Sequence, residues 1–292
     1  MSTLTQSRRG TDSTGVSGPA KVVLYAILIL LTIAFVGPIV FILVNSFKQK
    51  FAIANSPFAL PLGDLWAGID NYVVGLTKQG FHWAVLWSFV ITILSVIAIV
   101  FLSAMTAYYI TRVKTWWTSA IYYVLVFSMV IPFQMVMFPT VQIADMLNLN
   151  NPLGIVVLYV GFGAGLSVFM FSGFVKSIPL EIEEAAIMDG CGPLQSYFRV
   201  VFPMLKPTAI TVAILNAMWV WNDYLLPYLV IGLSTPYKTI PVVIQSFVGS
   251  QGNRDMGAMM AMLVLAIVPI IIFYVSAQKY IIEGVAAGAV KG

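Results

Sequence analysis

The feature that most constrains this chain is the presence of long runs without a charged residue. No Asp, Glu, Lys or Arg occurs from Val22 to Phe47, and a second uncharged run extends from Trp83 to Thr111. A helix of about 20 apolar residues crosses the roughly 30 Å of hydrocarbon in a bilayer. Only 9% of the chain is charged, against about 25% in soluble domains. The chain is therefore predicted to be an all-α integral membrane protein.

Six transmembrane helices are predicted, at about 22–47, 83–111, 116–138, 153–175, 207–230 and 257–282. Tryptophans begin the second of these and tyrosines end it, as expected where aromatic side chains lie at both membrane interfaces. Residues 21–292 are predicted to form one transmembrane domain. Residues 1–20, rich in Ser, Thr and Gly, are predicted to be a disordered cytoplasmic tail. The run after this tail is too long for the apolar region of a signal peptide.

Basic residues are unevenly distributed between the two sides that six spans define. One side holds Arg8, Arg9, Lys21, Arg112, Lys114, Lys176, Arg199, Lys206, Lys279 and Lys291, and the other holds Lys48, Lys50, Lys78, Lys238 and Arg254. Ten basic residues against five indicate that the first side is cytoplasmic. Both termini are therefore predicted to be cytoplasmic in this multi-pass protein.

A polar insert, residues 178–206, lies between the fourth and fifth predicted spans. Three of the chain's 11 acidic residues, Glu181, Glu183 and Glu184, lie within four positions of it. Carboxylates stabilise the first turns of a helix, and Pro179 suits the beginning of one. Gly190 can take a positive φ and is expected to end this helix.

The second half of the insert is predicted to form another short helix, beginning at Gly192-Pro193 with Phe198 on its apolar side. Pro203 is expected to end this helix, and Pro207 to begin the fifth span. Two short helices joined by a sharp corner would transmit force better than a flexible loop. The alternative is a surface loop whose acids are merely solvated, and the residues alone leave both interpretations open.

The insert resembles a known loop. The pattern Glu184-Ala185-Ala186-x-x-Asp189-Gly190, with Phe198, Pro203 and Pro207 following, resembles the EAA loop in permease subunits of ABC importers. In that family the loop forms a coupling helix that docks into a cleft on the ATPase subunit. The resemblance implies ATPase-coupling roles for Glu181, Glu184, Ala185, Ala186, Asp189, Gly190, Phe198, Pro203 and Pro207. It also implies that Glu184 pairs with a basic residue of the ATPase. Cys191 departs from the family, which more often has alanine there.

Two further segments resemble the carbohydrate-uptake permeases of the MalG-like type. They are Trp221-Asn222-Asp223-Tyr224-x-x-Pro227 and the ending Gly284-x-x-x-Gly288-Ala289-x-Lys291-Gly292. The resemblance implies a transmembrane subunit of an ATP-driven, binding-protein-dependent importer of a sugar or an oligosaccharide, which forms half of the translocation pathway. Related permeases also carry glycerol phosphate or other small solutes, which is the alternative within the same class.

The resemblance also implies the location and the partners. The location is the inner membrane of a bacterial or archaeal cell, in contact with membrane lipid. The partners are a second homologous permease subunit forming a heterodimer, two cytoplasmic ABC ATPase subunits, and an extracytoplasmic solute-binding protein. No cofactor is implied.

Asp223 is the one acidic residue inside a predicted span. Counted from Pro207 at 1.5 Å per residue, it lies about 24 Å along the helix, close to the outer interface. Acids at membrane depth face a cavity or a partner. Asn222 and Asp223 are therefore candidates for the translocation path or its outer gate, and a hydrogen bond between helices is the alternative.

Several function classes are disfavoured. The sequence shows no nucleophile–base set and no phosphate-binding glycine loop, so ATP hydrolysis would have to come from a partner. A single cysteine permits no internal disulfide or metal cluster, and no basic patch suggests nucleic acid. An ion-driven secondary transporter would need several intramembrane ionisable groups, of which only Asp223 is present. A membrane-embedded enzyme would need convergent polar residues inside the spans.

Overall fold

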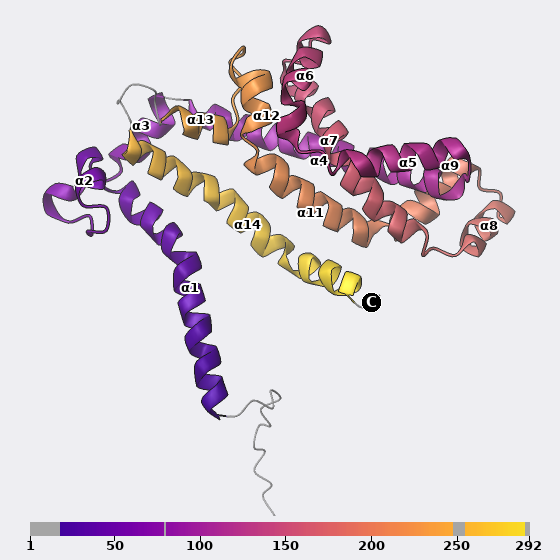
Figure 1. Ribbon diagram of the computed structural model, residues 1–292, viewed down its shortest axis with the longest axis horizontal. Helices are drawn as coiled ribbons and strands as arrows, with labels where there is room; N and C mark the ends of the chain where they lie inside the picture. The colour runs from indigo at the N-terminus through magenta and orange to yellow at the C-terminus, as the bar shows by residue number, and fades with distance from the viewer. Residues whose placement is uncertain (1–17, 79, 248–254, 290–292) are drawn as a thin grey trace, which may run out of the picture.

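The computed structural model describes residues 18–78, 80–247 and 255–289, and these residues are predominantly helical (Figure 1). Four helices in this part of the chain are long and apolar enough to cross a membrane. They are α1 (Gly18–Ser46), α4 (Phe81–Arg112), α7 (Pro152–Val175) and α14 (Met256–Ala289). They correspond to the first, second, fourth and sixth predicted spans, and the predicted all-α membrane fold is confirmed.

Two bent pairs of helices bring the number of spans to six if each pair is one span. The first is α5 (Trp116–Ser128) with α6 (Phe133–Met146), bent by 111°, and the second is Pro193–Met204 with α11 (Lys206–Asn222), bent by 72°. The segment Pro193–Met204 consists of α9 (Pro193–Ser196), η2 (Tyr197–Val201) and α10 (Phe202–Met204). The remaining elements are short: α2 (Lys50–Asn55), η1 (Gly63–Leu65), α3 (Asp70–Lys78), α8 (Leu180–Met188), α12 (Leu225–Pro227), η3 (Tyr228–Gly232) and α13 (Ile240–Ser246).

The third predicted span, 116–138, is not one continuous helix. Helix α5 has 13 residues, which is about 20 Å at 1.5 Å per residue and shorter than the hydrocarbon thickness. Pro132 explains the break, because a proline disfavours helical backbone at the residue before it and has no N–H to continue the helix. Helix α6 then turns sharply away from α5.

The fifth predicted span, 207–230, is also interrupted. Helix α11 ends at Asn222, and Asp223 has an extended backbone with φ −72° and ψ 125°. The side-chain Oδ1 of Asp223 accepts a hydrogen bond of 3.0 Å from the backbone N–H of Leu225, as capping residues do at the start of a turn. Helices α12 and η3 continue the chain in a new direction (Figure 1).

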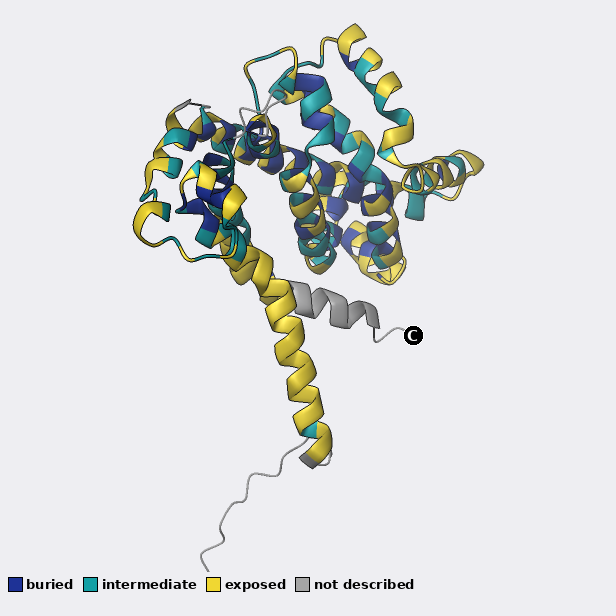
Figure 2. Cartoon of the chain, turned by 60° about the vertical axis from the view of Figure 1, so that its left-hand side comes forward, coloured by how far each residue is buried: buried dark blue, intermediate teal, exposed yellow. Residues whose placement is uncertain are grey.

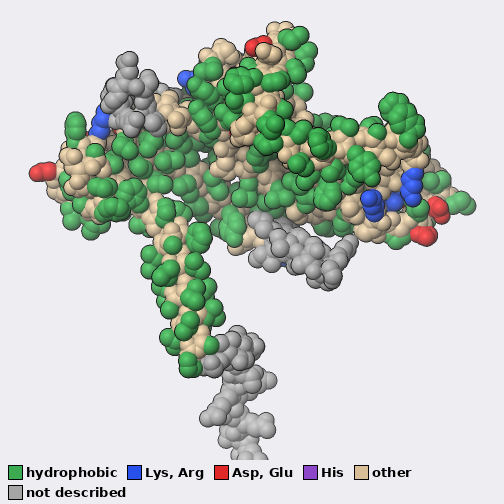
Figure 3. Space-filling view, viewed as in Figure 1, with side chains coloured by type: hydrophobic (Ala, Val, Ile, Leu, Met, Phe, Trp, Pro, Cys, Tyr) green, Lys and Arg blue, Asp and Glu red, His purple; other side chains and the backbone are tan. Residues whose placement is uncertain are grey.

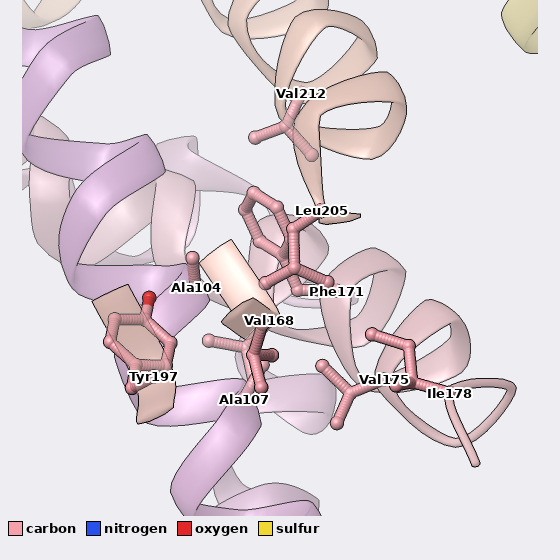
Figure 4. Packing of buried hydrophobic residues seen from close by; sticks show 10 residues of the cluster. Ala104, Ala107, Val168, Phe171, Val175, Ile178, Tyr197, Leu205 and Val212 are labelled. Carbon is pink, nitrogen blue, oxygen red and sulfur yellow. The ribbon is translucent and has the colours of Figure 1, made fainter. Parts of the chain in front are cut away.

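One of three buried apolar clusters in the described residues lies where α4, α7 and α11 meet the second half of the insert. Ten buried residues form a cluster there: Ala104, Ala107, Val168, Phe171, Val175, Ile178, Tyr197, Val201, Leu205 and Val212 (Figure 4). Because the cluster includes residues of the insert, burial of apolar surface holds the insert firmly to the long helices.

Helix α1 stands apart from this core. Figure 2 shows it as an exposed helix that joins the rest of the structure only at its C-terminal end, and none of its most apolar window is buried within the chain. The disordered tail predicted for residues 1–20 lies mostly outside the described residues, and α1 already begins at Gly18.

The segment that follows α1 is organised by buried polar groups. The ammonium of Lys48, which is 0% exposed, donates hydrogen bonds to the carbonyl oxygens of Ser56 (3.0 Å) and Pro57 (2.9 Å). The amide of Asn71 donates to the carbonyl oxygens of Ser46 and Lys48, both at 2.8 Å. Burial lowers the pKa of Lys48. These contacts fix α2 and α3 against the end of α1.

Close packing of α5 on α7 predicts a clear difference between two glycines of α7. A Cβ at Gly165 would lie 2.6 Å from the backbone oxygen of Leu125, whereas one at Gly161 would meet nothing within 4 Å. We expect Gly165→Ala to destabilise the protein by about 1–3 kcal/mol through overpacking, and Gly161→Ala to be neutral or slightly stabilising. Thermal unfolding of the purified permease in detergent measures both. Equal midpoints would contradict the close approach of the two helices.

Candidate functional site

The insert begins with α8, which ends at a left-handed glycine. Gly190 has a φ of +85°. Its N–H donates to the carbonyl of Ile187 (2.9 Å), and the N–H of Cys191 donates to the carbonyl of Ala186 (3.0 Å). This pair of bonds is the Schellman arrangement that ends many helices. The helix stop predicted at Gly190 is confirmed, and the sharp corner after α8 follows from it.

The second half of the insert begins at the predicted position, but its helical segment does not end at Pro203. Gly192 precedes Pro193 at the first position of α9, and Gln195 Oε1 accepts a hydrogen bond from the N–H of Gly192 (3.2 Å). The five residues of η2 are π-helical, and α10 continues to Met204. The expectation that Pro203 ends this helix is therefore wrong. A local widening into π-helix accommodates the carbonyls that a proline leaves unpaired.

A bend separates the insert from α11. Leu205 is buried in the core cluster, and α11 begins at Lys206 with Pro207 in its first turn. A proline fits there because its missing N–H would have no helical partner. Pro207 therefore begins this helix as predicted.

Helix α8 has one face buried against the rest of the chain and one face exposed. Glu183 and Ala186 are 7% and 8% exposed, whereas Glu181, Glu184 and Ala185 are exposed. Ala186 therefore does not offer its methyl group to a partner, contrary to the interpretation of the sequence. Its spacing of three residues from Glu183 places both on the inward face.

The exposed part of the insert combines apolar and charged side chains. Its exposed large apolar residues are Leu180, Ile182, Ile187, Met188, Leu194 and Phe198. In Figure 3, acidic and basic side chains gather at the end of the molecule where α8 projects. Exposed apolar side chains next to charges are typical of surfaces that bind another protein.

Glu183 is the residue whose position sequence reasoning missed. Its Oε1 lies 2.6 Å from Nη2 and 2.7 Å from Nε of Arg112, at the end of α4. Its Oε2 accepts a hydrogen bond of 2.8 Å from the Tyr108 hydroxyl. Arg112 Nη2 also donates to the carbonyl of Ile178 (3.0 Å). The sequence signal that could have indicated this inward position is the spacing of Glu183 and Ala186, which places both residues on one face of the helix.

Phe198 packs on its own chain. Its ring is stacked on Phe101 of α4 with centroids 5.8 Å apart, and it remains 41% exposed. The neighbouring Tyr197 is buried and lies against Tyr108, with ring centroids 5.0 Å apart. These aromatic contacts attach η2 to the last turns of α4.

Asp223 and Asn222 lie at the far end of α11 from the insert. Asp223 Oδ2 accepts a hydrogen bond of 2.9 Å from the hydroxyl of Tyr159, a buried residue of α7. This is the interhelical hydrogen bond that stood as the alternative to a role in the pathway. Asn222 borders a groove of about 560 Å³ between α4, α11 and α14, whose other lining is almost wholly apolar.

These features define a class of protein. The chain is a multi-pass helical membrane protein with a braced insert that carries four acidic and two basic residues. No group of three or more His, Cys, Asp or Glu side chains suited to a metal occurs within the described residues.

Comparison with known proteins assigns the family. Residues 99–286 match the family of binding-protein-dependent transport system inner membrane components. The match covers more than half of the chain and includes the insert and Asp223, so the chain belongs to this family. The resemblance to ABC importer permeases is confirmed, and the matched residues include the Glu184-Ala185-Ala186 and Gly190 pattern.

Two relatives align over most of their length. The chain is 39% identical over 263 residues to the probable starch degradation products transport system permease protein AmyC of Thermoanaerobacterium thermosulfurigenes, covering 90% of this chain and 94% of that protein. It is 34% identical over 272 residues to the multiple sugar-binding transport system permease protein MsmG of Streptococcus mutans, covering 91% and 96%.

A solved structure shares the fold. A chain from the crystal structure of a bacterial ABC transporter involved in the import of the acidic polysaccharide alginate superposes with a TM-score of 0.74 at 22% identity. The superposition covers 91% of this chain and 98% of that chain.

The left-handed backbone at Gly190 generates a prediction for the corner after α8. A Cβ at this position would meet nothing within 4 Å, so any effect of a side chain comes from the backbone conformation. We expect Gly190→Val to cost about 1–2 kcal/mol locally and Gly190→Asn much less, because Asn tolerates this region. Amide hydrogen exchange at position 190 and at Cys191 should rise by about tenfold in the valine variant. Equal exchange in both variants would argue against this backbone requirement.

Proposed function

We propose that this chain is one permease subunit of an ATP-driven importer of a sugar or an oligosaccharide. The observation that carries the proposal is the similarity to AmyC and MsmG, which extends over at least 90% of this chain. The names of these relatives specify starch degradation products and multiple sugars as solutes. Similarity over the whole transmembrane domain supports the same class of solute here.

The insert is the part of the chain that contacts the ATPase. The exposed face of α8, with Glu184 and Ala185, docks into a cleft on a cytoplasmic ATPase subunit, and Glu184 pairs with a basic residue there. Exposure of Ile187 (56%) and Met188 (86%) supports this docking, because such apolar side chains gain free energy when a partner covers them. Glu181 and Asp189, also exposed, flank the contact.

The rest of the insert conveys the movement of α8. Gly190 sets the angle between α8 and α9, and Phe198 attaches η2 to α4. Pro203 and Pro207 lie on either side of the bend that leads into α11. Closure of the ATPase pair moves α8 and shifts the bundle between inward-facing and outward-facing states, because the two states make different contacts with the ATPase.

The complete transporter contains further chains. A second, homologous permease supplies the other half of the pathway, two ATPase subunits bind the paired inserts, and a solute-binding protein docks on the outer side. Both termini and the insert are cytoplasmic, as the excess of basic residues on that side supports. Asn222 borders the path, and Asp223 braces its outer gate through Tyr159.

Transport in vesicles tests the proposed activity. The permease is reconstituted with its cognate permease, ATPase and binding-protein partners, and uptake of labelled glucose oligosaccharides is followed. We expect uptake to require ATP on the cytoplasmic side and the binding protein, and to survive an ionophore that collapses ion gradients. Uptake of glycerol phosphate in place of the sugars would overturn the assignment of the solute. Uptake that stops with the ionophore while ATP is held constant would overturn the ATP-driven mechanism.

Cross-linking tests the docking of α8, with a matched pair of neighbouring alanines. In a Cys191→Ala background, Ala185→Cys should be captured by the ATPase subunit, because Ala185 is exposed, whereas Ala186 is only 8% exposed. We therefore expect Ala186→Cys to give at least tenfold less product with the same short cross-linker. Absence of an ATPase product from Ala185→Cys under every nucleotide condition would refute the docking.

A further inference from the structure

Helix α8 has few connections to the long helices of the bundle. It packs chiefly against α9 and η2. Within the described residues, Glu183 is the α8 side chain that makes hydrogen bonds or an ion pair, and its partners are both on α4. The other inward residue, Ala186, contributes only a methyl group. The direct polar link between α8 and a membrane-spanning helix is therefore a single carboxylate.

Both oxygens of the carboxylate have partners, in a largely buried environment. The side chains of Arg112 and Glu183 are 15% and 9% exposed. One carboxylate oxygen contacts Nε and Nη2 of Arg112, and the other accepts from the Tyr108 hydroxyl. Because both side chains are largely buried, loss of either partner leaves the other charge unpaired and disfavoured.

Arg112 also forms a hydrogen bond with the backbone beside α8. Tyr108 and Arg112 are four residues apart and therefore lie on the same face of the last turn of α4. Arg112 Nη2 additionally holds the carbonyl of Ile178, in the connection between α7 and α8. The planar guanidinium thus joins α4 both to α8 and to the connection between α7 and α8 in one fixed geometry. We call Tyr108, Arg112 and Glu183 the bracket.

Helix α4 connects the bracket to the apolar groove. It runs without interruption from Phe81 to Arg112, and its residues Phe89, Thr92 and Ile93 line the same groove as Asn222. A rigid helix of this length passes a displacement at one end to the groove. An apolar contact would hold α8 at least as stably but would let it slide, because hydrophobic contacts are not directional.

We propose that the bracket is the positioning element through which movement of α8 is transmitted to α4. In this role Arg112 and Glu183 contact neither the solute nor the ATPase. They determine how much of each ATPase stroke reaches the translocation path. The inference rests on the proposed function, because it takes α8 to be the docking helix.

The experiment compares two readouts in the complete reconstituted transporter. The first is solute transported per ATP hydrolysed, and the second is cross-linking of Ala185→Cys to the ATPase. We expect Glu183→Gln and Arg112→Gln to keep the cross-link but to lower transport per ATP by tenfold or more. The double variant Arg112→Glu/Glu183→Arg should recover a large part of the lost transport per ATP. Tyr108→Phe should lower transport per ATP by about threefold. Lys114→Gln, which removes a neighbouring exposed charge outside the bracket, should behave as the unaltered protein.

The outcomes separate this inference from the proposed function. If the cross-link is absent in the protein with an intact bracket, the docking itself is wrong. If the cross-link persists and Glu183→Gln transports as much solute per ATP as the unaltered protein, the bracket has only a structural role and the inference is overturned. A structural role would lower the amount of assembled transporter without changing that ratio. If neither single variant assembles, Tyr108→Phe decides: a threefold loss supports the inference, and an unchanged ratio overturns it.

Discussion

Hydrocarbon offers no partner to a backbone N–H or C=O, so every segment that crosses a bilayer has to satisfy these groups internally. This constraint produces the long helices α1, α4, α7 and α14, and it leaves van der Waals packing as the main force between them. Gly163 and Gly165 of α7 serve that packing. A Cβ at Gly163 would lie 2.7 Å from Ile99 of α4, and one at Gly165 would collide with the backbone of α5. The small residues therefore determine how closely the central helices approach.

The same constraint moves most charges out of the spans, and the charged groups described as buried are held by hydrogen bonds or by an opposite charge. The Arg112–Glu183 pair joins the insert to α4, while the core cluster joins it to α7 and α11. The two contacts differ in kind. Apolar burial supplies most of the stability, whereas the ion pair and its hydrogen bonds specify the orientation of α8. The insert is consequently a braced structure rather than a solvated loop, and this distinction supports its role as a mechanical link.

At the other end of α11, a second polar contact interrupts a helix. Asp223 leaves the helical conformation, caps the next turn and accepts a hydrogen bond from Tyr159. A carboxylate at this depth needs such partners, since an unpaired charge near hydrocarbon is costly. The break therefore ties the end of α11 to α7, beside the groove that Asn222 borders. The molecule thus has a charged brace near each end of α11 and an almost wholly apolar groove between them.

The sequence by itself determined the class of protein, four of the six spans and the corner at Gly190. Each of these depends on local chemistry: uncharged runs have one favourable environment, and a left-handed helix end favours glycine. It also contained the EAA pattern from which the family was inferred. The tertiary structure decided which face of α8 is buried, the bends after α5 and α11, and the partners of Glu183 and Asp223. Arg112 and Glu183 are 71 positions apart, and Tyr159 and Asp223 are 64 apart. No local pattern specifies such pairs, because they depend on how α4, α7 and α11 pack in three dimensions.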